Sequence, residues 1–319
     1  MNIQKMKGPI LIFGAGGFIG FNALLTILKK RKDVVGVSHD PNSNWRFNAG
    51  LFSAIHIKKC DMNKREKLTQ ILTEIKPRTI LNFAAFGAYS YQKDLYNIYQ
   101  TNFITTLNSI EIAKKIGFDA YVYAGTSSEY GLNCVAPKEQ DELIPNSHYA
   151  VSKAAVSHLI TYYGKIESLP ITHLRLYSAY GPWEEPKRLI PQLILHAERG
   201  GFPPLVNPLI SRDYVYVDDI VQVFIQSALH INKMKGSIFN VATGNKTTIR
   251  QLVRTVKSLA NLKQKPVFSS MPNRDWDLVN WYGNATRLAI ITQGKSFSSL
   301  EQGINETIKW HSIKKIWHL

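Results

Sequence analysis

Tyr149 and Lys153 are the two residues whose types and spacing point most directly to chemistry in this chain of 319 residues. The apolar residues that follow, within 154–160, recur at the three- and four-residue spacing of a helix. On a helix, side chains four positions apart lie on one face. An ammonium group beside a phenol favours the phenolate and lowers the tyrosine pKa from about 10 toward neutrality. The pair could therefore take a proton from a hydroxyl or return one to a ketone, unless it is only an exposed pair on an amphipathic helix.

A cluster of hydroxyl groups follows the apolar segment 120–124, which predicts a buried strand. Its members are Thr126, Ser127 and Ser128. Open α/β sheets bind their ligands at the carboxyl ends of parallel strands. Thr126 is therefore predicted to hydrogen-bond the reacting oxygen, and the alternative is a turn that only ends the strand.

A glycine-rich turn near the N-terminus must hold whatever reacts with these side chains. It lies between a predicted strand at 9–13 and a helical pattern that runs through 23–28. The first glycine allows a tight turn, the second lets the backbone approach a pyrophosphate, and the third lets helix and strand pack closely. The helix N-terminus then faces the diphosphate of a dinucleotide. The cofactor contacts predicted here are Gly14, Gly17, Phe18, Ile19 and Gly20.

The end of the second predicted strand, 34–38, bears on the choice between NAD and NADP. An acidic residue there would bind the adenosine ribose and favour NAD, but this chain has Ser38. With Ser38 in that position, a 2′-phosphate could be accepted with Arg46 as its counter-charge. If Asp40 instead turns back to the ribose, NAD is preferred. The sequence does not decide between NAD and NADP, and it slightly favours NADP.

Further cofactor contacts are predicted after the third and fourth strands, expected at 54–57 and 79–83. Asp61 and Met62 could border the adenine, and the small side chains of Ala84 and Ala85 would leave room for the cofactor. A long helix is predicted at 92–116 with Asn102 in its middle. A buried Asn102 could bridge backbone groups near Lys153, whereas the alternative is an amide on the helix surface.

Composition limits the class of protein. Hydrophobic residues make up 45% and charged residues 19%, which is ordinary for a soluble globular protein. Cys60 and Cys134 are far apart and lack metal-ligand spacing, so we expect neither a disulfide framework nor a metal site. No apolar run reaches the roughly 20 residues of a membrane helix, so a cytoplasmic location is expected.

The net charge of +16 raises the question of a nucleic-acid partner. The lysines are scattered over helix ends and turns, however, and a basic surface would also attract a small anionic substrate. We therefore expect neither a nucleic-acid nor a membrane partner.

Several groups of residues, in order along nearly the whole chain, resemble the extended short-chain dehydrogenase/reductase family, in its nucleotide-sugar epimerase/dehydratase branch. They are Gly14, Gly17 and Gly20, the segment 126–131, the segment 145–149 with Lys153, and the segments 175–182, 212–219 and 239–242. The resemblance implies an α/β fold: a Rossmann-like doubly wound parallel sheet with a smaller C-terminal α/β substrate-binding lobe. We expect the NAD(P)-binding domain at 1–178, with 213–243 returning to it, and the nucleotide-sugar-binding lobe at 179–212 and 244–319.

The resemblance also implies the roles of the catalytic residues. Tyr149 would be the acid/base, Lys153 would tune it and hold the nicotinamide ribose, and Thr126 would share the hydrogen bond to the reacting oxygen. Hydride would pass between a sugar carbon, most often C4, and the nicotinamide.

Dehydratases of this branch usually carry an Asp-Glu pair directly after the Thr. Here those positions are Ser127 and Ser128, and the neighbouring Glu129 is expected to point elsewhere. Elimination needs a general acid and a base, which two serines supply poorly. We therefore favour a 4-ketoreductase, a C4 oxidase or a 4-epimerase over the alternative, a 4,6-dehydratase.

The implied substrate is a nucleotide-diphosphate sugar. Ser178 takes the place of an Asn that contacts the sugar diphosphate in the family, and Arg212 matches a diphosphate-binding Arg, with a surface pair to Asp213 as the alternative. Arg188 is a further candidate for the same anion, and Arg274 for the nucleotide. The family also implies a homodimer through helices near 92–116 and 148–167. A non-catalytic nucleotide- or RNA-binding relative is the alternative of another class, but such forms tend to lose the Tyr/Lys pair that this chain keeps.

Overall fold

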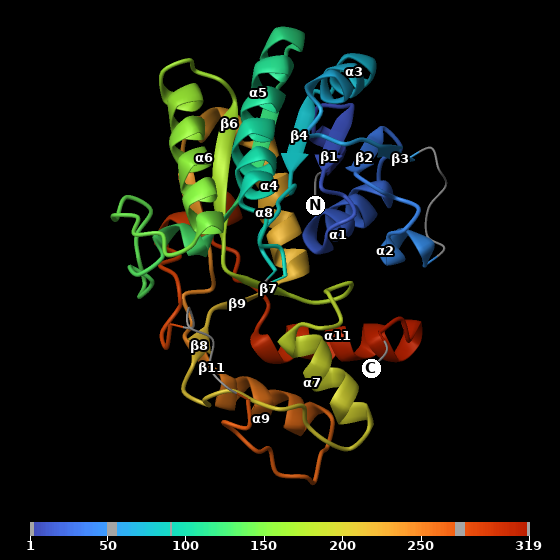
Figure 1. The fold of residues 1–319 in the computed structure, drawn as a ribbon, viewed down its shortest axis with the longest axis vertical. Helices are drawn as coiled ribbons and strands as arrows, with labels where there is room; N and C mark the ends of the chain where they lie inside the picture. Colours follow the sequence, from blue (N-terminus) through green and yellow to red (C-terminus); the bar gives the residue numbers. More distant parts are fainter. Residues whose placement is uncertain (1–2, 50–55, 90, 272–277, 318–319) are drawn as a thin grey trace.

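A parallel β-sheet of seven strands forms the centre of the protein (Figure 1). The structure is a computed structural model, and it describes residues 3–49, 56–89, 91–271 and 278–317. Across the sheet the strand order is β10, β6, β5, β4, β1, β2, β3. Their bounds are β1 Ile10–Phe13, β2 Val34–Ser38, β3 Ile57–Lys59, β4 Thr79–Asn82, β5 Ala120–Thr126, β6 Ile171–Leu176 and β10 Ile238–Val241. Because β1 pairs with both β2 and β4, the strand order reverses between β1 and β4, which is where open α/β sheets form their ligand crevice.

Helices cover both faces of the sheet because both faces are apolar. Alternate side chains of β1 point to opposite sides: Ile10 and Ile12 pack with α1 and α8, whereas Leu11 and Phe13 pack with α3, α5 and α6. The bounds of these helices are α1 Phe18–Leu28, α3 Arg65–Ile75, α5 Thr105–Ile116, α6 His148–Lys165 and α8 Val217–Leu229. The doubly wound arrangement predicted from the sequence is confirmed.

A second group of elements lies beyond the carboxyl ends of the strands, in the lower half of Figure 1. Its helices share an apolar core that includes Leu193, Val253 and Ile304. The hydroxyl of Thr248 accepts a hydrogen bond from the amide N–H of Gln251 and so caps the N-terminus of α9. The elements are α7 Leu189–Glu198, α9 Ile249–Leu259 and α11 Leu300–Lys314, with the strand pairs β7 Ser178–Tyr180 with β9 Tyr214–Tyr216 and β8 Ser211–Arg212 with β11 Thr247–Thr248.

The helix predicted at 92–116 has three parts. It begins as α4 Leu95–Tyr99, widens into a π-helical segment Gln100–Ile104, and continues as α5. π-helical turns inside helices are frequent at functional sites, and this one contains Asn102. The remaining short helices are Ile3–Lys5, α2 Trp45–Asn48, Ser127–Tyr130, Ile231–Lys233, Thr286–Leu288 and α10 Ala289–Thr292.

One predicted strand is shifted. The third strand was expected at 54–57, but β3 occupies Ile57–Lys59, because its residues pair in register with the end of β2 from Gly36 to Ser38. Residues 54 and 55 lie outside the described part of the chain. The strands predicted at 9–13, 34–38, 79–83 and 120–124 are present as β1, β2, β4 and β5.

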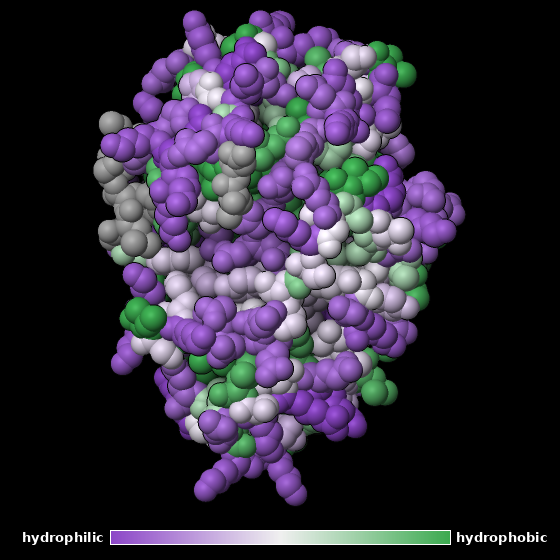
Figure 2. All heavy atoms as spheres, turned by 180° about the vertical axis from the view of Figure 1, so that it is seen from behind, coloured by the Kyte–Doolittle hydropathy of each residue, from purple (hydrophilic) through white to green (hydrophobic). Residues whose placement is uncertain are grey.

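Hydrophilic residues cover most of the face drawn in Figure 2, and hydrophobic residues form small separate groups on it. Within the described residues, no helix is both long enough and apolar enough to cross a membrane.

Candidate active site

A cleft opens at the carboxyl ends of β1, β4, β5 and β6, at the switch point of the sheet. It brings together most of the side chains that the sequence predicted. Those that line it are Gly14, Gly17, Phe18, Ile19, Gly20, Ala85, Thr126, Ser127, Ser128, Tyr149, Lys153, Ser178, Arg188 and Arg212.

The glycine turn is shaped to bring backbone close to backbone. Gly14 has φ +72°, and a Cβ added there would lie 2.7 Å from the amide nitrogen of Ala84. A Cβ at Gly20 would collide with the carbonyl of Gly14, so β1 and α1 meet without side chains between them. Helix α1 begins directly after this turn, and its first residues line the cleft. A helix N-terminus at a glycine cradle is suited to the diphosphate of a dinucleotide, so these residues fit the cofactor that the sequence implies.

Tyr149, Lys153 and Thr126 meet in this cleft from two elements. Tyr149 and Lys153 lie one turn apart on α6, which begins at the Ser147 cap, and Thr126 ends β5. The Thr126 side chain lies close enough to Tyr149 to lower the pKa of its phenol. The three predicted catalytic side chains are therefore brought together.

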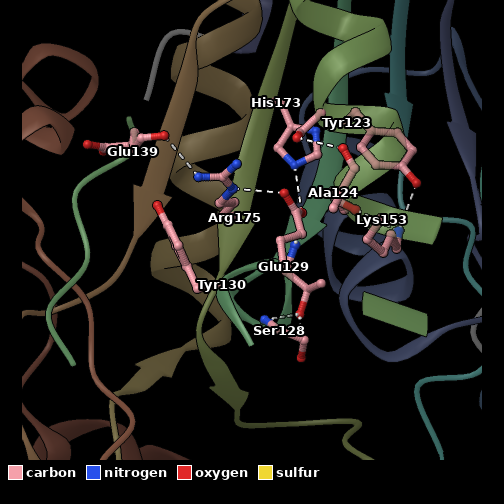
Figure 3. A network of polar contacts seen from close by, with 12 residues as sticks. Tyr123, Ala124, Ser128, Glu129, Tyr130, Glu139, Lys153, His173 and Arg175 are labelled. Atoms are coloured by element: carbon pink, nitrogen blue, oxygen red, sulfur yellow. Dashed lines mark hydrogen bonds and ion pairs between the residues drawn. The ribbon is translucent and has the colours of Figure 1, made fainter. Parts of the chain in front are cut away.

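The electrostatics of the pair differ from the prediction. The Lys153 ammonium donates to the Tyr123 hydroxyl at 2.9 Å and to the Ala124 carbonyl at 2.8 Å (Figure 3). Burial lowers the pKa of Lys153 to about 7. Burial also raises the pKa of Tyr149, and the Thr126 side chain opposes that rise. The expected fall of the tyrosine pKa toward neutrality is therefore not met, because desolvation outweighs the attraction of nearby charges.

Glu129 points away from the cleft, as predicted. Its carboxylate accepts from the Thr126 amide and from His173 Nε2, both at 2.8 Å, and from Arg175 Nε at 2.8 Å (Figure 3). The side chain is fully buried, and the charges of His173 and Arg175 hold its pKa at about 2 despite burial. Glu129 thus anchors the turn that presents Thr126, and it stays ionised.

Asn102 is fully buried and joins two parts of the site. Its side-chain oxygen accepts from the Phe86 amide at 2.9 Å, and its side-chain nitrogen donates to the Phe86 carbonyl and to the Ser152 hydroxyl. It therefore ties the loop after β4 to the residue before Lys153. The prediction of a bridging amide is confirmed, and the alternative of a surface amide is wrong.

Of the residues predicted to select the cofactor, Ser38 and Arg46 both lie at Gly16 of the glycine turn, whereas Asp40 makes its contacts elsewhere. Ser38 Oγ lies beside the glycine turn, 2.9 Å from where a Cβ of Gly16 would stand. Asp40 accepts from Ser43 and pairs with Lys59 at 3.6 Å, so its carboxylate is held on the surface instead of turning back to the glycine turn.

Arg46 is not an exposed counter-charge for a 2′-phosphate, which corrects the prediction. Only 5% of the residue is exposed, and Nε donates to the Trp183 carbonyl at 2.8 Å. Its Nη1 donates to the Gly16 carbonyl, and Nη2 lies 3.5 Å from the Glu185 carboxylate. Burial lowers its pKa, and Glu185 balances its charge.

Three predicted contacts lie near the cleft without lining it. Asp61 and Met62 follow β3, where the Cys60 amide donates to the Ser38 carbonyl, and Ala84 packs against Gly14. Arg274 lies outside the described residues.

The predicted substrate contacts occupy the other end of the cleft. Ser178 and Arg188 line it, and Arg212 lies with its guanidinium 5.3 Å from the centre of the Trp281 ring. Arg212 Nη1 donates to the carbonyls of Ser211 and Leu278. Asp213 is fully buried instead of forming part of a surface pair, and it accepts from the amides of the loop 243–244.

Sequence reasoning missed several residues of the cleft wall. Tyr89, Gln92 and Glu184 line it, and Tyr123 holds Lys153. The two consecutive glutamates that follow Trp183 in the sequence could have indicated Glu184 as a candidate site residue. Its burial, however, depends on chain segments far away in the sequence.

Comparison with known proteins places these observations in context. Residues 10–242 match the model of the NAD dependent epimerase/dehydratase family. UDP-glucuronate 4-epimerase 4 of Arabidopsis thaliana is 26% identical to this chain, over 95% of it and 75% of the relative.

Two solved structures share the fold. UDP-glucose 4-epimerase of Thermotoga maritima, solved with UDP-glucose, superposes with a TM-score of 0.83 at 23% identity, over 96% of this chain and 99% of that one. dTDP-glucose 4,6-dehydratase of Bacillus anthracis, solved with NAD, has a TM-score of 0.80 at 26% identity, over 97% of each chain. The bound cofactor in the latter is NAD, so the lean to NADP finds no support there.

Proposed function

This chain belongs to the NAD dependent epimerase/dehydratase family, and on that premise we propose that it inverts C4 of the hexose in a nucleotide-diphosphate sugar. The similarity to 4-epimerases of UDP-sugars supports this reaction and a UDP-linked substrate. The observation that carries the proposal is the meeting of Tyr149 and Thr126 in a cleft from which Glu129 is turned away.

Each catalytic side chain then has one task. Tyr149, whose pKa burial raises, can take the proton of the C4 hydroxyl only as the phenolate, a form that positive charge close by favours. It later returns the proton to the 4-keto sugar, while the Thr126 hydroxyl holds the same oxygen. Lys153, fixed by Tyr123 and Ala124, orients the cofactor ribose and supplies positive charge when protonated. When bound, NAD would supply the hydride chemistry at C4.

Inversion requires that both faces of the keto sugar be presented to the same hydride donor in turn. The sugar must therefore rotate within the cleft between the two transfers. Ser127, Ser128 and Ser178 line the cleft with small side chains that leave room for this rotation. A simple 4-ketoreductase or C4 oxidase would need no such rotation.

Loss of water is disfavoured. A dehydratase needs an acid and a base beside the sugar. Two serines stand where the family's acid pair usually lies, and Glu129 is committed to His173 and Arg175.

NAD is the proposed cofactor. The charge of Arg46, the predicted partner of a 2′-phosphate, is balanced by Glu185, and the similar dehydratase was solved with NAD. Equilibrium binding of NAD and NADP tests this: NAD should bind at least about 10-fold more tightly, because NADP would bring an uncompensated phosphate.

The wider organisation is proposed on the same basis. The chain would form an NAD-binding domain from residues 1–178 and 213–243, and a nucleotide-sugar-binding lobe from residues 179–212 and 244–319. A homodimer through α4–α6 is supported by exposed apolar side chains on these helices, among them Leu95, Tyr96, Val151 and Tyr162. Arg212 would hold the diphosphate, and Arg274, outside the described residues, would hold the nucleotide. Arg188, the further candidate for the diphosphate, lies 3.5 Å from the Glu184 carboxylate instead. The proposed location is the cytoplasm.

The test is conversion of UDP-glucose to UDP-galactose in the presence of NAD, followed by chromatography, for the native protein and for Tyr149→Phe. Removal of the phenol should lower kcat by about 10²- to 10⁴-fold. Tyr162→Phe is the matched control, because Tyr162 is on the same helix and half exposed. Undiminished turnover in Tyr149→Phe contradicts the mechanism. A product that has lost water identifies a dehydratase, and binding without turnover in the native protein identifies a non-catalytic relative.

A further inference from the structure

Glu184 is a buried carboxyl group in the wall of the active-site cleft that the proposed reaction does not use. It lines the same cleft as Tyr149, and its side chain is only 6% exposed. Its Oε1 lies 3.5 Å from Arg188 Nε, while Oε2 is buried and has no hydrogen-bond partner among the described residues. Such an oxygen is costly to bury, so its position is a feature of the site that needs a reason.

The backbone fixes Glu184 firmly. Its carbonyl accepts from Trp317 Nε1 at 3.0 Å, so the C-terminal segment holds the peptide in place. The preceding residue, Trp183, has φ +68°, an unfavourable conformation for a bulky side chain. The Trp183 carbonyl is in turn held by Arg46. The peptide groups on both sides of Glu184 are therefore held in place, which fixes where its side chain leaves the backbone in the cleft wall.

The charges around Glu184 are already balanced. Two guanidinium groups, Arg46 and Arg188, face two carboxylates, Glu184 and Glu185. The charges of all four groups also act on the pKa of the Tyr89 phenol. Burial raises the pKa of Glu184 to about 7, and Arg188 opposes the rise. A ligand that brings another carboxylate to this wall would therefore meet a site with no positive charge to spare.

This wall borders the reacting sugar. Tyr149, Glu184 and Arg188 line the same cleft, and Arg188 Nε lies 3.5 Å from the Glu184 carboxylate, so a sugar at the Tyr149 hydroxyl shares this cleft with both. The hexose carbon outside the ring carries a hydroxymethyl group in a neutral sugar and a carboxylate in a uronate. The charge of that substituent is what Glu184 can discriminate.

We infer that Glu184 makes the cleft selective for a nucleotide-linked hexose that is uncharged, and against the corresponding uronate. The inference rests on the proposed function. A hydroxymethyl group can donate a hydrogen bond to the carboxylate, whereas a uronate places like charge against like charge. The relatives of this chain include an epimerase of each kind, for UDP-glucuronate and for UDP-glucose, so resemblance alone does not make this choice.

The selectivity should depend on pH. Below about pH 7 Glu184 gains a proton and the repulsion weakens, whereas above it the carboxylate is ionised. The other charged and titratable groups that face it are Arg46, Arg188, Glu185 and Tyr89, and the Tyr89 phenol stays neutral across this range because burial raises its pKa. The preference for the neutral sugar should therefore increase as the pH rises through about 7.

The experiment compares kcat/KM for UDP-glucose and UDP-glucuronate, with NAD, between about pH 6 and about pH 8.5. It uses the native protein, Glu184→Gln, and Glu185→Gln as the control for the neighbouring carboxylate. The native protein should prefer UDP-glucose by at least about 10-fold at the high end, with the ratio falling toward low pH. Glu184→Gln should lose most of this preference and its pH dependence, and Glu185→Gln should keep both.

A native preference for UDP-glucuronate, or a ratio that stays flat with pH in the native protein, overturns the inference while leaving epimerisation intact. The native pH profile gives this result even if Glu184→Gln does not fold. If neither sugar is converted and neither binds, the proposed function itself is wrong, and the inference falls with it.

Discussion

Replacing Glu129 by Gln separates structural support from catalysis more sharply than any other single change. The carboxylate is fully buried and shared by Arg175, His173 and the Thr126 amide. Glutamine keeps the shape of the side chain but removes its charge. Arg175, which is only 2% exposed, then keeps a buried charge without its counter-ion.

Two independent arguments give the expected loss in the free energy of unfolding. Removing one partner of a buried ion pair costs about 3–5 kcal/mol of the free energy of unfolding. The pKa of Glu129 falls from 4.5 in an unperturbed side chain to about 2 in the fold, which corresponds to about 3 kcal/mol at about 1.4 kcal/mol for each pKa unit. We therefore expect Glu129→Gln to lose roughly 3 kcal/mol at neutral pH.

The sign of the pH dependence follows from the lowered pKa. Above about 4.5 the carboxylate is ionised in both the folded and unfolded states, so the full stabilisation is present. As the pH falls through this value toward about 2, the unfolded state takes up a proton that the folded state resists, and the stabilisation is lost. The difference in unfolding free energy between the native protein and Glu129→Gln should therefore shrink below about pH 4.5, whereas other carboxylates contribute equally to both proteins.

Urea denaturation followed by circular dichroism measures this difference at several pH values. Glu142→Gln is the control, because Glu142 is exposed and the change should stay within about 0.5 kcal/mol. A loss below about 1 kcal/mol at neutral pH, or a loss that is constant with pH, refutes the anchoring role. Retained stability together with a loss of turnover would instead identify Glu129 as an acid or base in the reaction.

Two further changes test how the fold positions the site. Gly14→Ala should weaken NAD binding by at least about 100-fold in a fluorescence titration, because its Cβ meets the Ala84 backbone. Gly200→Ala is the control, since Gly200 has a similarly positive φ but lies in open space, and it should leave NAD binding unchanged. Equal effects of the two changes would contradict the role of the glycine turn in holding NAD. Asn102→Ala should cost about 1–3 kcal/mol of unfolding free energy, because it leaves the Phe86 amide and carbonyl without their partner. The change should also lower kcat, and a normal kcat would show that Asn102 supports only the fold.

The sequence determined the fold because its signals are local. Apolar runs with glycine boundaries predict buried parallel strands, and a tight turn needs a residue that tolerates positive φ, as Gly14 does at +72°. The helix around Tyr149 and Lys153 and the hydroxyl group of Thr126 at a strand end are equally local features. Their meeting in one cleft follows once the strands are ordered, since parallel strands end at the same edge of the sheet.

Only the tertiary structure decided the electrostatics. Spacing predicted a lowered pKa for Tyr149, but burial raises it, and Lys153 is held by Tyr123, thirty positions earlier in the chain. Arg46 was expected to serve a phosphate, yet its partner Trp183 lies 137 positions away. Glu184 is held by Trp317, 133 positions away. The pKa of a buried group depends on desolvation and on charges that come from distant segments, and neither can be read from the spacing of neighbouring residues.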